Sequence, residues 1–236
     1  MRRAACAWLA ALGIAASAQA GNVSVGANAS FDLGTGSLAL GCADLDVAGT
    51  VSAGGVGFTQ GRDVAIGSNG TLNGDSATLE LSGDWDNQGT FVAGTSTVRM
   101  VDGCALLSAV VSGKSSFHNF VVESAGGKQI RFEAKATQQV TNLLSFAGVL
   151  GSLLQIRSTV DGTPAYLDAE GASSASFVDV QDNDATPGGP VMLGSDSVKG
   201  PNTPGWQLSA EIPLLPPLAL AALAFALAAV ARTARV

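Results

Sequence analysis

The feature that most constrains the fold of this chain is a short phrase that recurs at intervals of 21 and 19 residues. Each copy is a glycine and a threonine followed by an apolar residue, and the copies lie at residues 49–51, 70–72 and 89–91. A strand-like piece with apolar residues at alternate positions precedes each copy, at residues 45–47, 64–66 and 79–81. Self-similarity at this period predicts a solenoid in which each repeat forms one coil.

Residues 79–103 indicate what one coil contains. Leu79 and Leu81 alternate with polar residues, and Val98 and Met100 flank Arg99, which is the pattern of strands with one buried face. The glycine, aspartate and asparagine residues between them favour a turn. We therefore predict an all-β protein, a right-handed parallel β-helix. A β-sandwich is the alternative, since its strands are also short, but a sandwich has no reason to repeat its sequence.

The second half of the chain keeps the strands but loses the clear repeat. Ile130 and Phe132 alternate with charged residues, and residues 176–180 resemble a last well-formed strand. Residues 149–156 favour a strand over a helix, because the segment is short and contains Gly151. We expect Trp206 to cover the open end of the stack, where an uncovered edge invites aggregation.

The N-terminus has the pattern of an export signal. Arg2 and Arg3 precede an apolar stretch, and Ala18 and Ala20 form the small-x-small pattern of a signal peptidase site. Cleavage after Ala20 would leave Gly21 as the first residue. We predict that residues 1–20 are a signal peptide.

The C-terminus has the pattern of a membrane anchor. Residues 212–231 carry no charge, and twenty apolar residues can span a bilayer. Arg232 and Arg235 follow at once, so the positive-inside rule places this end in the cytoplasm. We predict a linker with a sorting motif at 208–217, an anchor helix at 218–231 within the apolar span, and a basic tail at 232–236.

Two phrases in the predicted β-solenoid domain, residues 21–207, resemble the coil repeats of bacterial exported β-helix surface proteins. They are LSGDWDNQGTF at residues 81–91 and FVDVQD at residues 177–182. Ile212, Pro213 and Leu215, followed by an apolar helix and basic tail, resemble the IPTL-type sorting signals related to PEP-CTERM signals, which exosortases process. This chain has Leu214 where the motif has threonine. The resemblance implies a place at the cell envelope and contact with exosortase-like sorting machinery.

Charge excludes one class of partner. Of 12 lysines and arginines, four lie in the two end segments, whereas all 19 acidic residues lie between Asp32 and Glu211. The exported part therefore has a formal charge near −11, which repels phosphate backbones. We expect no nucleic-acid partner.

The cysteines of the mature chain, Cys42 and Cys104, are predicted to be free. The 62 residues between them correspond to about three coils, or about 14 Å along the stack at the usual strand spacing. A disulfide requires Cα atoms within roughly 7 Å. We therefore expect two separate buried thiols and no disulfide.

Residues capable of catalysis or metal binding are few. His118 is the only histidine, and we predict that it faces solvent from a strand. Asp84, Asp86 and Asp102 could pair as a glycosidase acid and base, but aspartates at corners more often bond to their own backbone. The oxygen-rich segment with Asp179, Asp182 and Asp184 is a weak Ca²⁺ candidate. We predict no catalytic residue and no other cofactor.

These patterns favour an exported, envelope-anchored protein with a structural or adhesin-like role and no enzymatic activity. Its expected partners are the membrane, through the C-terminal helix, the export machinery, and an extracellular glycan or surface. A polysaccharide-active lyase or glycosidase is one alternative, which requires acidic and basic side chains in one groove. A carbohydrate- or matrix-binding module is another, although three tryptophans and one tyrosine offer little for an aromatic row.

Overall fold

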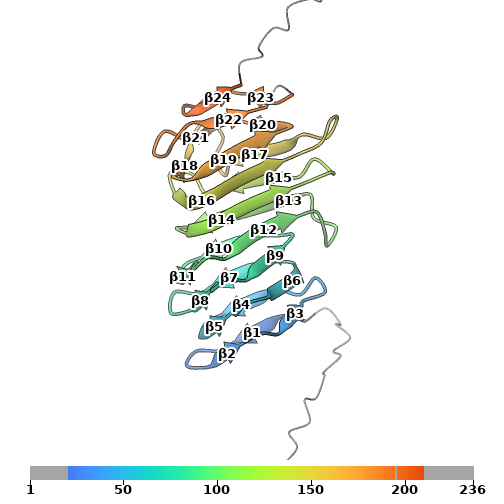
Figure 1. Ribbon diagram of the computed structural model, residues 1–236, viewed down its shortest axis with the longest axis vertical. Helices are drawn as coiled ribbons and strands as arrows, with labels where there is room; N and C mark the ends of the chain where they lie inside the picture. The colour runs from blue at the N-terminus through green and yellow to red at the C-terminus, as the bar shows by residue number, and fades with distance from the viewer. Residues whose placement is uncertain (1–20, 195, 210–236) are drawn as a thin grey trace, which may run out of the picture.

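The computed structural model describes residues 21–194 and 196–209. These residues form 24 strands and no helix, and every pair of strands is parallel, as in the pair of Val23–Val25 with Leu45–Val47. Figure 1 shows the strands stacked one coil above another along the long axis of the molecule. This is the predicted β-solenoid, and the parallel pairing excludes the β-sandwich, whose sheets are antiparallel.

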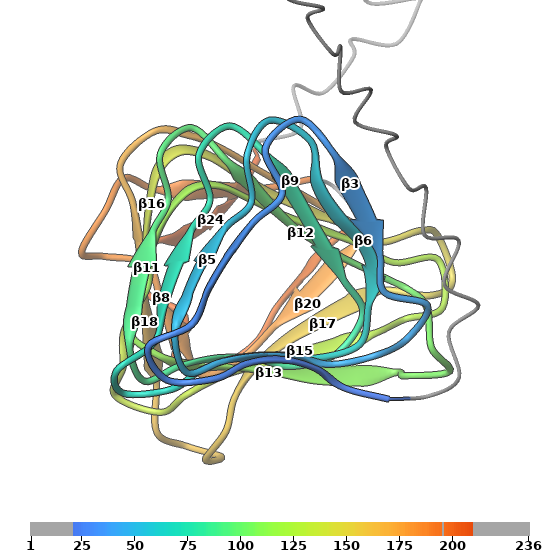
Figure 2. The same ribbon diagram turned by 90° about the horizontal axis from the view of Figure 1, so that it is seen from below.

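Each full coil contributes a strand to each of three sheets, which form the sides of a triangular prism (Figure 2). Sheet A has nine strands: β1 (Val23–Val25), β4 (Leu45–Val47), β7 (Val64–Ile66), β10 (Trp85–Asn87), β13 (Ser108–Gly113), β15 (Gln129–Phe132), β17 (Leu154–Ser158), β20 (Val178–Val180) and β23 (Val198–Lys199). Sheet B has four: β2 (Ser30–Asp32), β5 (Thr50–Ser52), β8 (Thr71–Asn73) and β11 (Thr90–Val92). Sheet C has eleven: β3 (Ser37–Ala39), β6 (Gly57–Gly61), β9 (Thr78–Leu81), β12 (Thr97–Val101), β14 (Ser116–Glu123), β16 (Thr137–Ala147), β18 (Ala165–Ala169), β19 (Ala172–Ser176), β21 (Asn183–Asp184), β22 (Val191–Leu193) and β24 (Trp206–Leu208).

The core is a column of apolar side chains inside the prism. Alternate residues of each strand point inward, so that Leu79 and Leu81 pair with Val98 and Met100 of the next coil, and all four are buried. From Trp85 onward the column contains a chain of aromatic side chains among aliphatic ones. Ring centroids of successive neighbours lie 4.7–6.3 Å apart from Trp85 to Trp206. Such contacts add to the free energy gained by burying apolar surface.

The recurring phrase forms equivalent positions on successive coils. Thr50, Thr71 and Thr90 are paired in register in sheet B, as the repeat predicted. The preceding glycines lie where successive coils approach closely. A Cβ on Gly70 would lie 2.0 Å from the carbonyl oxygen of Val47, so only glycine fits this corner.

One of the three strand-like pieces is not equivalent to the other two. Leu45–Val47 and Val64–Ile66 pair in sheet A, but their equivalent in the next coil is Trp85–Asn87. Residues 79–81 belong to β9 in sheet C. The segment from 82 to 96, predicted as a polar corner, therefore contains β10 and β11. The sequence suggested otherwise because only Trp85 of β10 is apolar.

The last part of the chain is broken at more corners than predicted. Residues 176–180 are split between β19 and β20 at Phe177, which has a left-handed φ of 52°. The strand expected at 149–156 begins only at Leu154. Trp206 is buried in the last strand of sheet C, and its Nε1 donates a hydrogen bond to Asn183 Oδ1 at 3.0 Å. It thus closes the core at this end, as expected.

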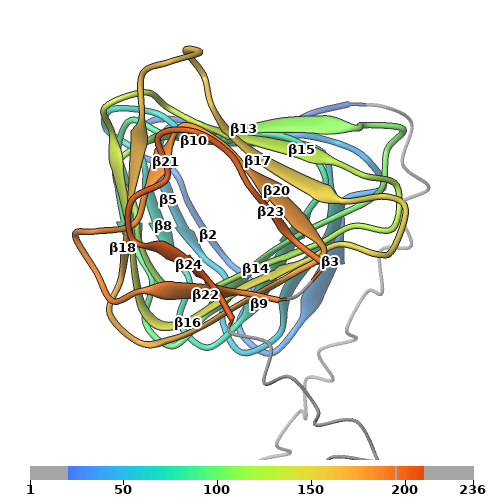
Figure 3. The same ribbon diagram turned by 90° about the horizontal axis from the view of Figure 1, so that it is seen from above.

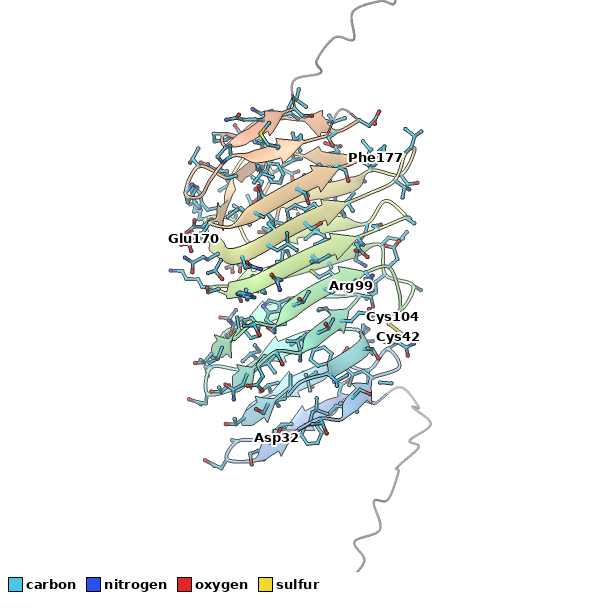
Figure 4. All side chains as sticks on the ribbon, viewed as in Figure 1. Asp32, Cys42, Arg99, Cys104, Glu170 and Phe177 are labelled. Atoms are coloured by element: carbon cyan, nitrogen blue, oxygen red, sulfur yellow. A yellow bond between two sulfur atoms is a disulfide. The ribbon has the colours of Figure 1, made fainter. Side chains whose placement is uncertain are left out.

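The prediction of free cysteines is wrong. Cys42 and Cys104 form a disulfide with Cα atoms 5.5 Å apart, and Figure 4 shows it at the edge of the stack. The estimate of about 14 Å holds for strands, but both cysteines lie in corner loops, at 40–44 and 102–107. The corners between them, at 62–63 and 82–84, are shorter. The second loop therefore reaches back until Cys104 Sγ lies 4.0 Å from the carbonyl oxygen of Gly61.

The predicted end segments lie outside the described residues. This applies to the signal peptide with Ala18 and Ala20, to the sorting motif and to the anchor with its arginines. Within residues 21–194 and 196–209, no helix is long and apolar enough to cross a bilayer.

Candidate functional site

Sheet B ends with β11, and the same side of the prism is continued by the first part of β16 and by β18 (Figure 2). The coils that start with β13 and β15 have no strand in sheet B and turn directly into β14 and β16. Their corners, at 113–115 and 133–136, and residues 87–89 of the coil before them surround a hollow of about 480 Å³. Lys114 and Lys135 line this hollow, and both are exposed.

A second hollow lies on the outer face of sheet A in the next coils. It has a volume of about 360 Å³, and the described residues that line it are all polar: Gln129, Arg131, Arg157, Asp161 and Gln181. We call it the Arg131 hollow. Its volume is within the range of small-molecule sites.

The floor of the Arg131 hollow is formed by Gln129 and Arg131 of β15 and Arg157 of β17, which belong to two rows of paired side chains. Gln129 is paired with Gln155, and Arg131 with Arg157. The amides touch, with Gln129 Nε2 donating to Gln155 Oε1 at 3.2 Å. Strand pairing in parallel register places each row directly above its equivalent, about 4.8 Å away. The planar ends of these side chains therefore form a regular array.

The loop between β17 and β18 forms the wall of the Arg131 hollow, and it projects from the corner of the prism (Figure 3). Asp182 holds this loop, because its Oδ2 accepts a hydrogen bond from Gly162 N at 2.9 Å. Burial would raise the pKa of Asp182, but hydrogen bonds from Gly162, Asn202 and Gln181, together with the charge of Arg157, lower it below the ordinary value. Asp182 therefore stays ionised and keeps the wall in place.

The two arginines in the floor differ in their partners. Arg157 binds Asp179 at 2.7 Å through Nη2 and is held in place. Arg131 donates from Nη2 to the carbonyl oxygen of Thr159 at 2.8 Å, and within the described residues no carboxylate lies within 4 Å of it. Most of its five N–H donors are therefore available to a ligand in the hollow. Asp161 lines the same hollow and forms no ion pair with the described lysines and arginines.

The disulfide corner has a structural role. Lys128 is fully buried there, and its Nζ donates to the carbonyl oxygens of Ser82 at 2.6 Å and Leu106 at 2.9 Å. Burial lowers the pKa of Lys128, against the opposing charges of Asp102 and Asp84. The lysine thus ties together corners from three coils beside the Cys42–Cys104 bond.

The aspartates considered for glycosidase chemistry bond mainly between coils. Asp84 Oδ1 accepts from Val110 N at 2.7 Å, and Asp102 Oδ2 accepts from Ala125 N at 2.8 Å. Asp86 Oδ1 accepts from Ser112 Oγ at 2.8 Å. The expected bonds to their own backbone were therefore wrong for Asp84 and Asp102, because stacking brings the next coil's N–H groups nearer. His118 lies half-exposed in β14, beside a shift in strand register.

The weak Ca²⁺ candidates are not gathered into one site. Asp179 binds Arg157, Asp182 is buried among amide donors, and Asp184 accepts from Thr186 at 2.8 Å. In the described part of the chain, no group of three or more metal-ligating side chains is present.

Sequence reasoning missed the Arg131 hollow, although a signal was present. The tripeptide Gln-Ile-Arg occurs twice, at 129–131 and at 155–157. In both copies the isoleucine is buried and the polar residues flank it on the outer face. The repeat was hidden because these coils are longer than the coils of the first half.

The chain matches no protein-family model, no curated protein and no solved structure.

Proposed function

We propose that this protein is an exported, envelope-anchored β-helix with a structural or adhesin-like role at the cell surface. The observation that carries this proposal is the rigid stack of parallel sheets, closed by a disulfide at one corner. Disulfides persist mainly in oxidising compartments outside the cytoplasm, so the Cys42–Cys104 bond supports export. A right-handed turn of the coil is expected, because connections between parallel strands are almost always right-handed.

The ends of the chain supply the targeting in this proposal. Residues 1–20 would direct export, with cleavage after Ala20. Residues 218–231 would anchor the protein in the membrane, with Arg232 and Arg235 in the cytoplasm. An exosortase-like enzyme would recognise the motif formed by Ile212, Pro213 and Leu215. The protein would then be either processed at this motif or retained in the membrane by its anchor.

A role as a glycan-binding module is the second candidate, and the Arg131 hollow favours it. Planar amide, guanidinium and carboxylate groups in one hollow are suited to sugar hydroxyl groups. Hydrolysis is less well supported, because a glycosidase requires two carboxyl groups across the scissile bond. Among the described residues that line the hollow, Asp161 alone carries one.

Surface labelling of intact cells tests the main proposal. A membrane-impermeant amine reagent should modify Lys114 and Lys135, which are exposed, but not the buried Lys128. The mature protein should start at Gly21 by N-terminal sequencing. An unlabelled protein that retains Met1 and fractionates with the cytoplasm would contradict the proposal.

A further inference from the structure

We propose that the Arg131 hollow binds an acidic sugar, a glycan unit that carries a carboxylate beside its hydroxyl groups. This inference deepens the glycan-binding candidate and rests on the protein being exposed outside the cell. It assigns the ligand class from three observations: the free donors of Arg131, the ordered polar floor, and the distribution of positive charge.

Arg131 is the group that selects the carboxylate. A guanidinium binds a carboxylate through two parallel N–H···O bonds, and these charge-assisted bonds are stronger than neutral ones. Arg157 cannot serve in the same way, because Asp179 already occupies it. The bond from Arg131 Nη2 to Thr159 holds the guanidinium in place, so little side-chain entropy is lost on binding.

The rest of the Arg131 hollow fits the hydroxyl groups of a sugar. Gln129 and Gln181 each present an amide with both donors and acceptors, and Asp161 presents acceptors from the wall. No aromatic side chain is among the described residues that line the hollow, so recognition would depend on hydrogen bonds. A ligand with alternating donors and acceptors satisfies this set better than a simple anion does.

Positive charge is concentrated in this part of an acidic molecule. The described residues contain eight lysines and arginines, and Arg62, Arg99 and Arg157 are in ion pairs. Lys128 is buried. Of the remaining four, Lys114, Arg131 and Lys135 lie on adjacent coils at the two hollows, where the acidic lining residues are Glu133 and Asp161. Positive side chains therefore outnumber carboxylates at each hollow and attract a local negative charge. The formal charge near −11 of the part predicted to be exported still disfavours a long, dense polyanion such as a nucleic acid.

Isothermal titration calorimetry with the full-length protein in detergent tests this inference. The probes are short oligogalacturonates, cello-oligosaccharides of the same length, and acetate. We expect oligogalacturonate to bind, cello-oligosaccharide to bind at least about tenfold more weakly, and acetate not to compete. Equal binding of the neutral sugar, equal competition by acetate, or no binding of any acidic sugar would each overturn the inference.

Matched variants locate the site. Arg131→Gln should lower the affinity for oligogalacturonate roughly 10- to 100-fold, the usual effect of losing a charge-assisted bond. Arg99→Gln makes the same change on sheet C and should leave the affinity unchanged. Arg131→Lys keeps the charge and a donor for Thr159, so it should fold and give an intermediate affinity. Equal losses in the Arg131 and Arg99 variants would mean that net charge alone is sensed, and the inference would fail.

Failure of the inference can be told apart from failure of the proposed function. Surface labelling and the mature N-terminus report export and display without any ligand. A surface-exposed protein that binds no acidic sugar would keep the structural role and lose the Arg131 site.

Discussion

At the disulfide corner, a few side chains connect coils that are distant from one another in the sequence. The Cys42–Cys104 bond closes a segment of 62 residues, which removes conformational freedom from the unfolded chain. The loop-closure relation for a segment of this size gives about 4 kcal/mol of stabilisation.

We therefore expect the double variant Cys42→Ser/Cys104→Ser to lose about 4 kcal/mol of unfolding free energy, measured by denaturant titration. Mass spectrometry of the unreduced wild type should show a mass two hydrogens below that of the reduced protein. Free thiols in the unreduced protein, or a variant as stable as the wild type, would contradict this assignment.

Lys128 carries a second prediction, because its buried Nζ satisfies two carbonyl oxygens. Lys128→Met should cost roughly 2–4 kcal/mol near neutral pH, since the two carbonyls lose their donor. The pKa of Lys128 is lower in the folded protein than its ordinary value of 10.5. At pH values between the folded-state pKa and the ordinary pKa, Lys128 is protonated in the unfolded chain but largely neutral in the folded protein. The free energy of unfolding therefore rises with pH over this range.

The measurement is the difference in unfolding free energy between wild type and Lys128→Met at several alkaline pH values. That difference should grow from the depressed pKa of Lys128 up to about pH 10.5. A difference that stays constant or shrinks over this range would mean that the burial of Lys128 does not depress its pKa.

Among the elements of the fold, the coil corners tolerate few substitutions of glycine. The glycines of the recurring phrase lie against the backbone of the preceding coil, and a Cβ on Gly70 would overlap the carbonyl of Val47. By contrast, a Cβ on Gly55, at another corner, would meet no heavy atom within 4 Å. The two glycines therefore form a matched pair.

Gly70→Ala should destabilise the protein by about 2 kcal/mol or more, because the backbone must shift to relieve the overlap. Gly55→Ala should be neutral or stabilise it by up to about 1 kcal/mol, since alanine restricts the unfolded chain. Thermal unfolding followed by circular dichroism compares them. Equal effects from the two variants would contradict the close approach of coils at Gly70.

At the scale of the whole molecule, the described solenoid and the C-terminal apolar segment are expected to act separately. Deletion of residues 214–236 should release the solenoid from the membrane fraction, because the deletion removes most of the predicted apolar anchor. Fractionation of cells that express the truncated and full chains measures this. A truncated protein that stays with the membrane fraction would show that another region holds it there.

The solenoid fold follows from patterns that are local in the sequence. The Gly-Thr phrase reappears as the Thr50, Thr71 and Thr90 ladder, because identical coils require the same tight corner at the same point. Alternating apolar residues such as Leu79 and Leu81 also identified their buried face. Both signals are local, with periods that a linear reading detects.

By contrast, no local pattern specifies which corners meet or which side chains share a hollow. Cys42 and Cys104 come together because a long corner loop folds back across two coils, and loop direction leaves no periodic trace in the sequence. Arg131 and Arg157 lie side by side because longer coils still stack in register. The Arg131 hollow depends further on the loop that Asp182 holds, and such contacts between distant corners are set by packing in three dimensions.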